Sequence, residues 1–285
     1  MPPLYPKMRE RPPEFRVNRA WPFVGNIKLG VVPPRVWSNV GYYNYQLRNV
    51  LNAPSIVYVP HLRRHAIYFP NVNKTDYYTI TAPFSMSDLG LGRRFLAVTW
   101  AWASPDIIST TWLGDIISDF TTWPSYQGAT FNRIKWSTNA MESYIYPGDY
   151  RATSAKNFLA RSTWMFLTTR GAYNSLAVYR DDILGASTSL GGNIGSGTTL
   201  KIGNRGDLGS GDGNTYIWVG YVTDVLLLDT DNMIISRELA DPSNIDLRIG
   251  GIPLILPPRR RFWPVVSEQA VPKMVPWHLF QQVGV

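Results

Sequence analysis

Residues 164–180, WMFLTTRGAYNSLAVYR, hold two short runs of β-forming residues, 164–169 and 175–180, on either side of the connection RGAYN. Threonine, tyrosine, valine and tryptophan fit the pleated, half-buried surface of a β-sheet. A short connection that contains glycine and asparagine is typical of a β-hairpin. The stretch therefore predicts two antiparallel strands joined by a turn.

Similar runs recur on both sides of this hairpin, each bounded by turn residues. The run at 95–103, FLAVTWAWA, is almost continuously apolar, as expected for a strand that is buried on both faces. Many short strands separated by turns predict an all-β sandwich or barrel. The remaining runs lie at 65–69, 77–81, 131–137, 143–146, 200–202 and 216–228.

The order and spacing of these runs resemble the laminin-G-like, concanavalin-A-like jelly-roll family over residues 61–246. SLAVYRDD at 175–182 is similar to the family's strand that ends in a Tyr-x-Asp/Asn-Gly turn, although Asp182 stands where the family usually has glycine. LKIG at 200–203 matches its next strand, and GYVTDVLL at 220–227 is similar to its Gly-x-Ile-Asp-x-Val strand.

The beginning of the same segment fits this family as well. HAIYFPNVNKTDYYTI at 65–80 resembles the opening pair of strands around a turn. The resemblance implies an all-β fold, a two-sheet antiparallel jelly-roll sandwich.

Charge and proline content divide the chain at the same places. Residues 1–60 carry eight Lys/Arg against two Glu, and residues 247–285 carry five Lys/Arg against one Glu. Sixteen of the 22 prolines fall in these two stretches. Because proline removes a hydrogen-bond donor and is excluded from central strands, we expect extended, basic arms at 1–60 and 247–285 around a domain at 61–246.

Both arms are rich in large aromatic residues, which solvated linkers usually lack. We therefore expect the arms to dock, either on their own domain or on a neighbouring protein. Burial of aromatic side chains and pairing of arginine with carboxylates would supply the affinity. The predicted partner-binding residues are Trp21, Phe23, Trp37, Arg259, Arg260, Arg261, Phe262 and Trp263.

The second arm adds another resemblance. A sandwich followed by LILPPRRRFW at 254–263 is similar to proteins encoded among the structural genes of tailed bacteriophages. This implies a virion structural protein, a decoration or tail-associated subunit, that docks on other capsid or tail proteins through its arms. It would be synthesised in the host cytoplasm and would repeat as a homo-oligomer in a symmetric particle.

A lectin-like module that binds host-surface glycans is the alternative. Jelly rolls carry such sites on rim loops, and aromatic faces stack on sugars. The candidates are Trp123, Tyr126 and the glycine-rich stretch 191–213. A lectin would keep its glycan binding after removal of the arms, whereas a structural subunit depends on them.

Enzymatic activity is not expected. A glycoside hydrolase on a jelly roll needs two carboxylates a few ångströms apart, and the signature Glu-x-Asp-x-x-Glu does not occur. Asp115, Asp119, Asp181 and Asp182 are the closest carboxylate groups in sequence, and we expect them to be solvated in loops. A hydrolase therefore ranks third, and no catalytic residue is predicted.

Cofactors and other partners are constrained by composition. The chain has no cysteine, which excludes disulfides and thiolate metal sites. Asp207 and Asp212, in a glycine-rich loop, are candidates for calcium, although a solvated loop is the preferred interpretation. The sequence contains no run of 18 apolar residues, so no membrane-spanning helix is expected. Arginine beside aromatic residues at 259–263 could bind nucleic acid, but the flanking prolines favour a protein partner.

Overall fold

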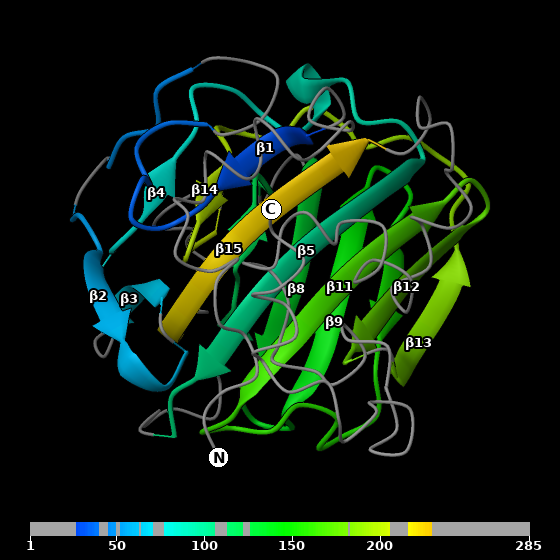
Figure 1. The fold of residues 1–285 in the computed structure, drawn as a ribbon. Helices are drawn as coiled ribbons and strands as arrows, with labels where there is room; N and C mark the ends of the chain where they lie inside the picture. The colour runs from blue at the N-terminus through cyan, green and yellow to red at the C-terminus, as the bar shows by residue number, and fades with distance from the viewer. Residues whose placement is uncertain are drawn as a thin grey trace, which may run out of the picture.

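The computed structural model describes residues 27–39, 45–49, 52–62, 64–70, 77–105, 113–121, 126–181, 183–205 and 216–229. In this part of the chain, two antiparallel β-sheets pack face to face (Figure 1). The structure thus confirms the predicted all-β, two-sheet jelly-roll class. No helix in the described residues is long and apolar enough to cross a membrane.

The first sheet has eight strands, and its long central strand β15 holds neighbours on both sides. One edge of β15 pairs with β5, while its other edge pairs first with β3 and then with β1. The order is β13 (Ile183–Ser189), β12 (Ser175–Arg180), β11 (Trp164–Ala172), β5 (Arg94–Ala103), β15 (Val219–Asp229), β3 (Arg64–Pro70), β2 (Ser55–Val59), with β1 (Ile27–Val31) beside β15.

The second sheet has seven shorter strands, and β6 and β7 pair with successive parts of β8. Two short 3-10 helices, η2 (Pro60–Leu62) and η3 (Ser87–Leu89), lie in connections. The strand order is β10 (Tyr150–Thr153), β9 (Ala140–Tyr146), β8 (Gly128–Lys135), β7 (Ile117–Ser118), β14 (Lys201–Ile202), β4 (Ile80–Thr81), with β6 (Leu113–Gly114) beside β8.

The predicted hairpin is confirmed as β11 and β12, which pair from Leu167↔Arg180 to Ala172↔Ser175. The predicted opening pair of strands differs from the structure. β3 belongs to the first sheet, whereas β4 belongs to the second, where Ile80 and Thr81 pair with β14. These two runs are therefore not partners of one another, because each one finds its hydrogen bonds in a different layer.

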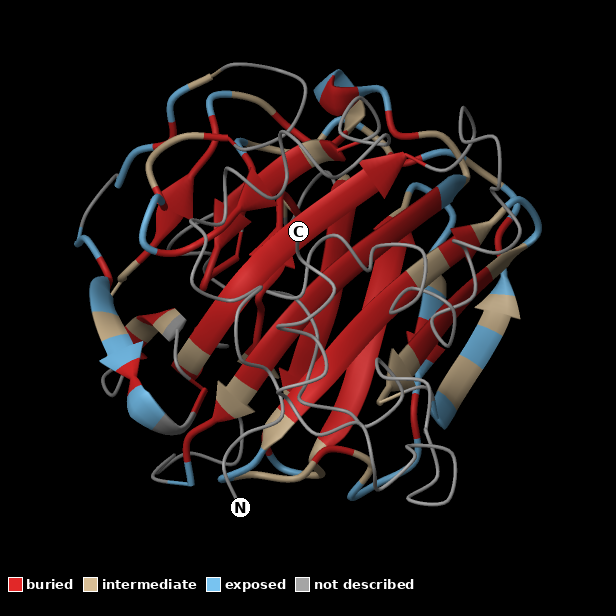
Figure 2. Ribbon diagram, viewed as in Figure 1, coloured by how far each residue is buried: buried red, intermediate tan, exposed pale blue. Residues whose placement is uncertain are grey.

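The main core fills the space between the sheets, and the central strands are buried while edge strands β2 and β13 are largely exposed (Figure 2). Successive strand residues point to opposite faces, so alternate residues of β5 point inward. Phe95 of β5 stacks on Phe131 of β8, with ring centroids 4.8 Å apart. The ring centroids of Trp136 and Trp218 lie 5.6 Å apart in the same core.

The sandwich begins earlier in the chain than the predicted boundary at residue 61. β1 and β2 both lie within residues 1–60, and β1 is almost entirely buried beside β15. The sequence IKLGV of β1 contains no proline, so it can complete a sheet ladder within a proline-rich stretch. Residues 1–26 and 247–285 lie outside the described residues.

A buried asparagine links the two sheets. Asn132 sits at an irregularity of β8 with φ of 56°, a backbone conformation that asparagine tolerates better than most residues. Its Nδ2 donates to Thr99 Oγ1 of β5 (3.3 Å), and its Oδ1 accepts from Thr169 Oγ1 of β11 (2.8 Å). Asn132 therefore satisfies polar groups of the opposite sheet inside the core.

We predict that Asn132→Ala destabilises the protein by about 2–4 kcal/mol, because buried partners lose their hydrogen bonds and the positive φ is strained. Asn157→Ala is the matched control, since Asn157 has φ of 59° but is exposed in a turn. Asn157→Ala should lower the free energy of unfolding by about 1 kcal/mol. Urea unfolding measures both, and equal losses would contradict a structural link through the Asn132 side chain.

Candidate functional site

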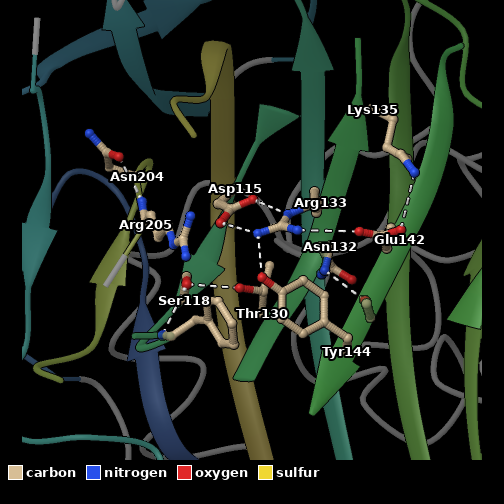
Figure 3. A network of polar contacts seen from close by, with 12 residues as sticks. Asp115, Ser118, Thr130, Asn132, Arg133, Lys135, Glu142, Tyr144, Asn204 and Arg205 are labelled. Atoms are coloured by element: carbon tan, nitrogen blue, oxygen red, sulfur yellow. Dashed lines mark hydrogen bonds and ion pairs between the residues drawn. The ribbon is translucent and has the colours of Figure 1, made fainter. Parts of the chain in front are cut away.

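The outer face of the second sheet carries a band of polar and aromatic side chains (Figure 3). In β9, Met141 and Ile145 point into the core, so Glu142, Tyr144 and Tyr146 point outward. Arg133 of β8 points to the same side, between Asp115 and Glu142. The band is thus built from two neighbouring antiparallel strands and the segment that precedes β7.

Arg133 is the centre of a buried ion network. Its Nε and Nη2 donate to the two oxygens of Asp115, the latter bond measuring 2.9 Å, and its Nη1 donates to Glu142 Oε1 at 3.2 Å. Nη2 also donates to the Tyr144 hydroxyl at 2.9 Å. The Arg133 side chain is 3% exposed, so these partners replace the water that the charge has lost.

The opposite charges around them favour the ionised forms of Arg133 and Glu142. Burial alone would raise the pKa of Glu142, but Arg133 and Lys135 outweigh it and hold that pKa below its usual range. Burial would likewise lower the pKa of Arg133, yet Asp115 and Glu142 raise it well above its ordinary value. Thr153 Oγ1 donates to Glu142 Oε2 at 2.9 Å and completes the shell of that carboxylate.

Arginines and aromatic rings alternate along the band. The Arg205 guanidinium lies 3.9 Å from the Tyr216 ring centre and 4.8 Å from that of Phe120. The Arg133 guanidinium lies 5.1 Å from the Tyr216 ring and 4.5 Å from the Tyr144 ring. Such cation–π contacts gain strength when they are shielded from water. The band is therefore a closely packed layer of arginines and aromatic rings.

One end of the band is a group of four aromatic residues, Phe120, Tyr126, Tyr144 and Tyr146, here called the tyrosine cluster. Phe120 stacks beside Tyr126 at 6.0 Å and meets Tyr144 edge-on at 4.7 Å. Tyr126 and Tyr146 lie 5.7 Å apart. Tyr126 is 46% exposed, whereas Phe120 and Tyr144 are buried beneath it. The tyrosine cluster therefore presents an aromatic surface on a fixed base.

Asp119 holds the backbone under this cluster. Its Oδ2 accepts from the Met86 N–H (2.6 Å) and its Oδ1 from the Ala129 N–H (2.7 Å). Gly128 has φ of 83°, and a Cβ there would lie 2.5 Å from Asp119 Oδ1. Burial raises the pKa of Asp119 to about 7, against the two backbone hydrogen bonds that lower it. Asp119 is thus a buried carboxylate that takes up a proton near neutral pH.

The glycine-rich stretch joins the same end of the band. The Thr198 N–H donates to the Asp119 carbonyl (2.7 Å), and the Gly195 N–H donates to the Tyr146 carbonyl (2.7 Å). A Cβ on Gly195 would lie 2.7 Å from the Tyr146 carbonyl oxygen, so glycine permits this close approach. Residues 191–198 therefore lie next to the tyrosine cluster.

The structure brings together two of the sequence candidates for ligand binding, Tyr126 and the first part of the stretch 191–213. Trp37, a predicted partner-binding residue, is half-buried and packs against the main core of its own domain. The other candidates lie outside the described residues, namely Trp21, Phe23, Trp123, Asp207, Asp212, Arg259, Arg260, Arg261, Phe262 and Trp263. In the described part of the chain, no group of three or more His, Asp or Glu could hold a metal ion.

The expectation that Asp115 and Asp119 are solvated loop carboxylates was wrong, since both are fully buried. Burial of Asp115 depends on Arg133, which lies 18 residues away and could not be paired with it from sequence alone. Glu142 and Tyr144 were also missed. The alternation in ESYIY at 142–146 was the available signal, because it places every second polar or aromatic side chain on one face.

We predict that Arg133→Met destabilises the protein by about 3–5 kcal/mol, because it leaves Asp115 buried without its ion-pair partner and leaves Glu142 with Lys135 in place of two partners. Arg151→Met is the matched control, since Arg151 forms an exposed pair with Asp149 and should cost at most about 1 kcal/mol. Thermal and urea unfolding measure both variants. A small loss for Arg133→Met would mean that the network does not carry buried charge.

A second prediction concerns pH. The pKa of Asp119 is about 7 in the folded protein and about 3.9 in an unfolded chain. Its contribution to stability is therefore fully present below about pH 4 and is lost as the pH rises to 7, at up to about 1.4 kcal/mol per unit. Urea unfolding at pH 5, 6 and 7 should show falling stability, with a shallower slope in Asp119→Asn.

Asp88→Asn is the control for this experiment. Hydrogen bonds from Ser85 lower the pKa of Asp88, so this carboxylate stays ionised over the whole range. The variant should keep most of the slope of the parent protein, because the charge of Asp88 is only a minor cause of the raised pKa of Asp119. Identical slopes for Asp119→Asn and the parent would show that Asp119 does not titrate between pH 5 and 7.

Comparison with known proteins yields structural similarity alone. No protein-family model matches the sequence, and no curated protein matches it. The receptor-binding domain of botulinum neurotoxin mosaic serotype C/D is similar at 12% identity and a TM-score of 0.55, over 80% of this chain and 51% of that chain. The binding domain of botulinum neurotoxin serotype D is similar at 11% identity and a TM-score of 0.52, over the same shares of each chain.

A smaller similarity, with a TM-score of 0.42 and 10% identity, involves Ruminococcus gnavus IT-sialidase CBM40 bound to alpha2,3 sialyllactose, over 55% of this chain and 89% of that chain. This chain spans about half the length of the two toxin domains. At identities this low, similarity concerns the fold, which is that of a jelly-roll β-sandwich.

Proposed function

We propose that this chain is a non-enzymatic carbohydrate-binding module whose ligand rests on Tyr126 and Tyr146. The observation that carries the proposal is the setting of Tyr126. Three tyrosines in the described residues are prominently exposed, namely Tyr58, Tyr126 and Tyr173. Only Tyr126 among them belongs to an aromatic group, the tyrosine cluster, that is mounted on a polar sheet face.

Polar groups beside the tyrosine cluster suit a sugar. Small-molecule sites combine aromatic surface with a few fixed polar groups. Here Gln127, next in the chain, is half-buried, and the exposed pair Asp149–Arg151 lies just beyond Tyr146. An aromatic face can stack on the apolar face of a sugar ring, while an amide, a carboxylate and a guanidinium can bind its hydroxyl groups.

The buried layer explains how such a surface is held in place. Tyr144 is fixed by Arg133, and Phe120 is held between the Arg205 guanidinium and Tyr126. Asp119 fixes the backbone immediately before Phe120. A surface that is ordered before the ligand arrives loses less conformational entropy on binding. The close packing of the layer therefore supports binding by the exposed rings.

Hydrolysis is not favoured by the carboxylates of the site. A general acid needs a raised pKa and access to substrate. Glu142 is buried with a lowered pKa, and Asp119 is buried with both oxygens bound to backbone N–H groups. These carboxylates hold structure together. The toxin structures with the same fold are described as binding domains, which supports binding without turnover, although a fold by itself does not assign a function.

The virion structural role implied by the sequence resemblance stays a prediction, together with its virion location and homo-oligomeric assembly. It depends on the two arms, most of whose named residues lie outside the described part of the chain. Trp37 is the exception, and it packs against its own domain. A carbohydrate-binding module could serve adsorption to a host surface, so the two proposals are compatible.

We predict that Tyr126→Ala weakens glycan binding at least tenfold, which corresponds to about 1.4 kcal/mol. The parent protein is first screened on a glycan array, and the strongest ligand is then titrated by calorimetry against parent and variant. The loss arises because the sugar ring no longer has an aromatic face to stack on. Folding should change little, because Tyr126 is half exposed.

Tyr173→Ala is the matched control. Tyr173 is 52% exposed, but it lies at the β11–β12 turn beneath Arg93, away from the tyrosine cluster. This variant should bind the glycan as the parent does. Equal binding by the parent and Tyr126→Ala, or no glycan bound by the parent at all, would refute the proposed site.

A further inference from the structure

The outer face of the first sheet is apolar, in contrast to the polar outer face of the second. Alternate residues of β5 and β15 that point away from the main core form a second hydrophobic cluster with β11 and β1. In the ladder, Leu96 faces Leu228, Val98 faces Leu226 and Trp100 faces Phe166. The cluster also includes Ile27, Val32, Val59, Leu62 and Ala66.

An aromatic row crosses this face at the end where β15 begins. The register aligns Trp164 of β11, Trp102 of β5, Tyr221 of β15 and Tyr68 of β3. Tyr221 lies 5.4 Å from Trp102, 4.7 Å from Tyr68 and 6.3 Å from Trp164, measured between ring centroids. All four rings are half-buried. The row is a continuous aromatic strip over four neighbouring strands.

The apolar face behaves as an interior. Val98, Trp100, Phe166 and Leu226 are 0–1% exposed, although every described strand of the second sheet packs against the opposite side of the first. A monomer seldom leaves an apolar area of this kind in contact with water. A further layer must therefore lie over it.

We propose that this layer is the C-terminal segment of the same chain, with residues 252–264 on the aromatic row. This stretch reads IPLILPPRRRFWP. Proline-rich segments are extended, and aromatic-lined surfaces are their preferred docking sites. Leu254, Leu256, Phe262 and Trp263 provide apolar groups for the adjoining cluster, while the three arginines between them can extend to water.

The path of the chain permits this arrangement. β15 ends at Asp229, beside Phe95 and at the far end of the face from the aromatic row. Eleven strand residues at about 3.3 Å each make the return distance about 36 Å. More than twenty residues separate Asp229 from residue 252, and an extended chain of that length reaches well beyond this distance.

The N-terminal arm fits the face less well. Its first 19 residues carry seven charged side chains spread along the sequence, whereas the three arginines of residues 252–264 are consecutive and follow an uncharged run at 249–258 (IGGIPLILPP). Burying unpaired charge on an apolar surface is costly. The apolar remainder of that arm, residues 20–26, is short for a face that extends over β5, β11 and β15.

The test is site-specific photo-crosslinking in the full-length protein. Tyr221 is replaced by p-benzoylphenylalanine, the sample is irradiated, and the adducts are mapped by mass spectrometry. The proposal predicts an adduct within residues 230–285 that migrates at the mass of a monomer. An adduct to residues 1–26, an adduct found only at the mass of a dimer, or no adduct would each overturn it. The same probe at Tyr173, outside the face, should give no adduct to residues 230–285, and an equal yield there would also overturn the proposal.

A second measurement uses substitutions in the arm, which leave the sandwich unchanged. The full-length variant Leu254→Ser/Leu256→Ser should increase the fluorescence of a dye for exposed apolar surface several-fold, because the aromatic row loses its cover. The matched variant Trp21→Ser/Phe23→Ser in the other arm should leave it unchanged. The reverse order, or equal signals, would overturn the proposal. Neither measurement depends on glycan binding, so the two proposals can fail separately.

Discussion

The pairing of β5 with β15 is the constraint on which the rest of the structure depends. These strands run side by side from Gly220↔Ala103 to Asp229↔Phe95, with one irregularity, and both are apolar on their two faces. Their apolar inner face is buried by packing against the second sheet, and this contact forms the main core. Their outer face demands a further cover. A strand pair that is buried on both sides cannot lie at the surface, so it determines where every other layer must go.

The second sheet has the opposite character, because only one of its faces is apolar. Its outer residues replace hydrophobic packing with the Arg133–Asp115–Glu142 network and the rings that lie against it. Paired buried charges of this kind add little net stability, but the loss of one partner is strongly destabilising. They hold Tyr144 and its aromatic neighbours in one arrangement. Thus the apolar sheet carries the fold, while the polar sheet carries the tyrosine cluster that we propose as the carbohydrate-binding surface.

Sequence patterns predicted the parts of this molecule that local chemistry controls. The hairpin of β11 and β12 followed from turn residues between β-forming runs, and the burial of β5 followed from its continuous apolar character. Tyr126 and the adjoining stretch 191–198 could be named as candidates, but Phe120, Tyr144 and Tyr146 could not. The burial of Asp115 and Asp119, and the separation of β3 and β4 into different sheets, depend on partners far away in sequence.

One feature of the sheet has a mechanical consequence. β1 begins at Ile27 opposite Leu228, and β15 ends at Asp229, so the first and last strands of the described residues begin and end side by side. Tension applied directly at Ile27 and Asp229 would open the β1–β15 ladder one hydrogen bond at a time, because the bonds lie across the strands. The domain would yield to a modest pull at that corner, while β5 and β11 bear no load.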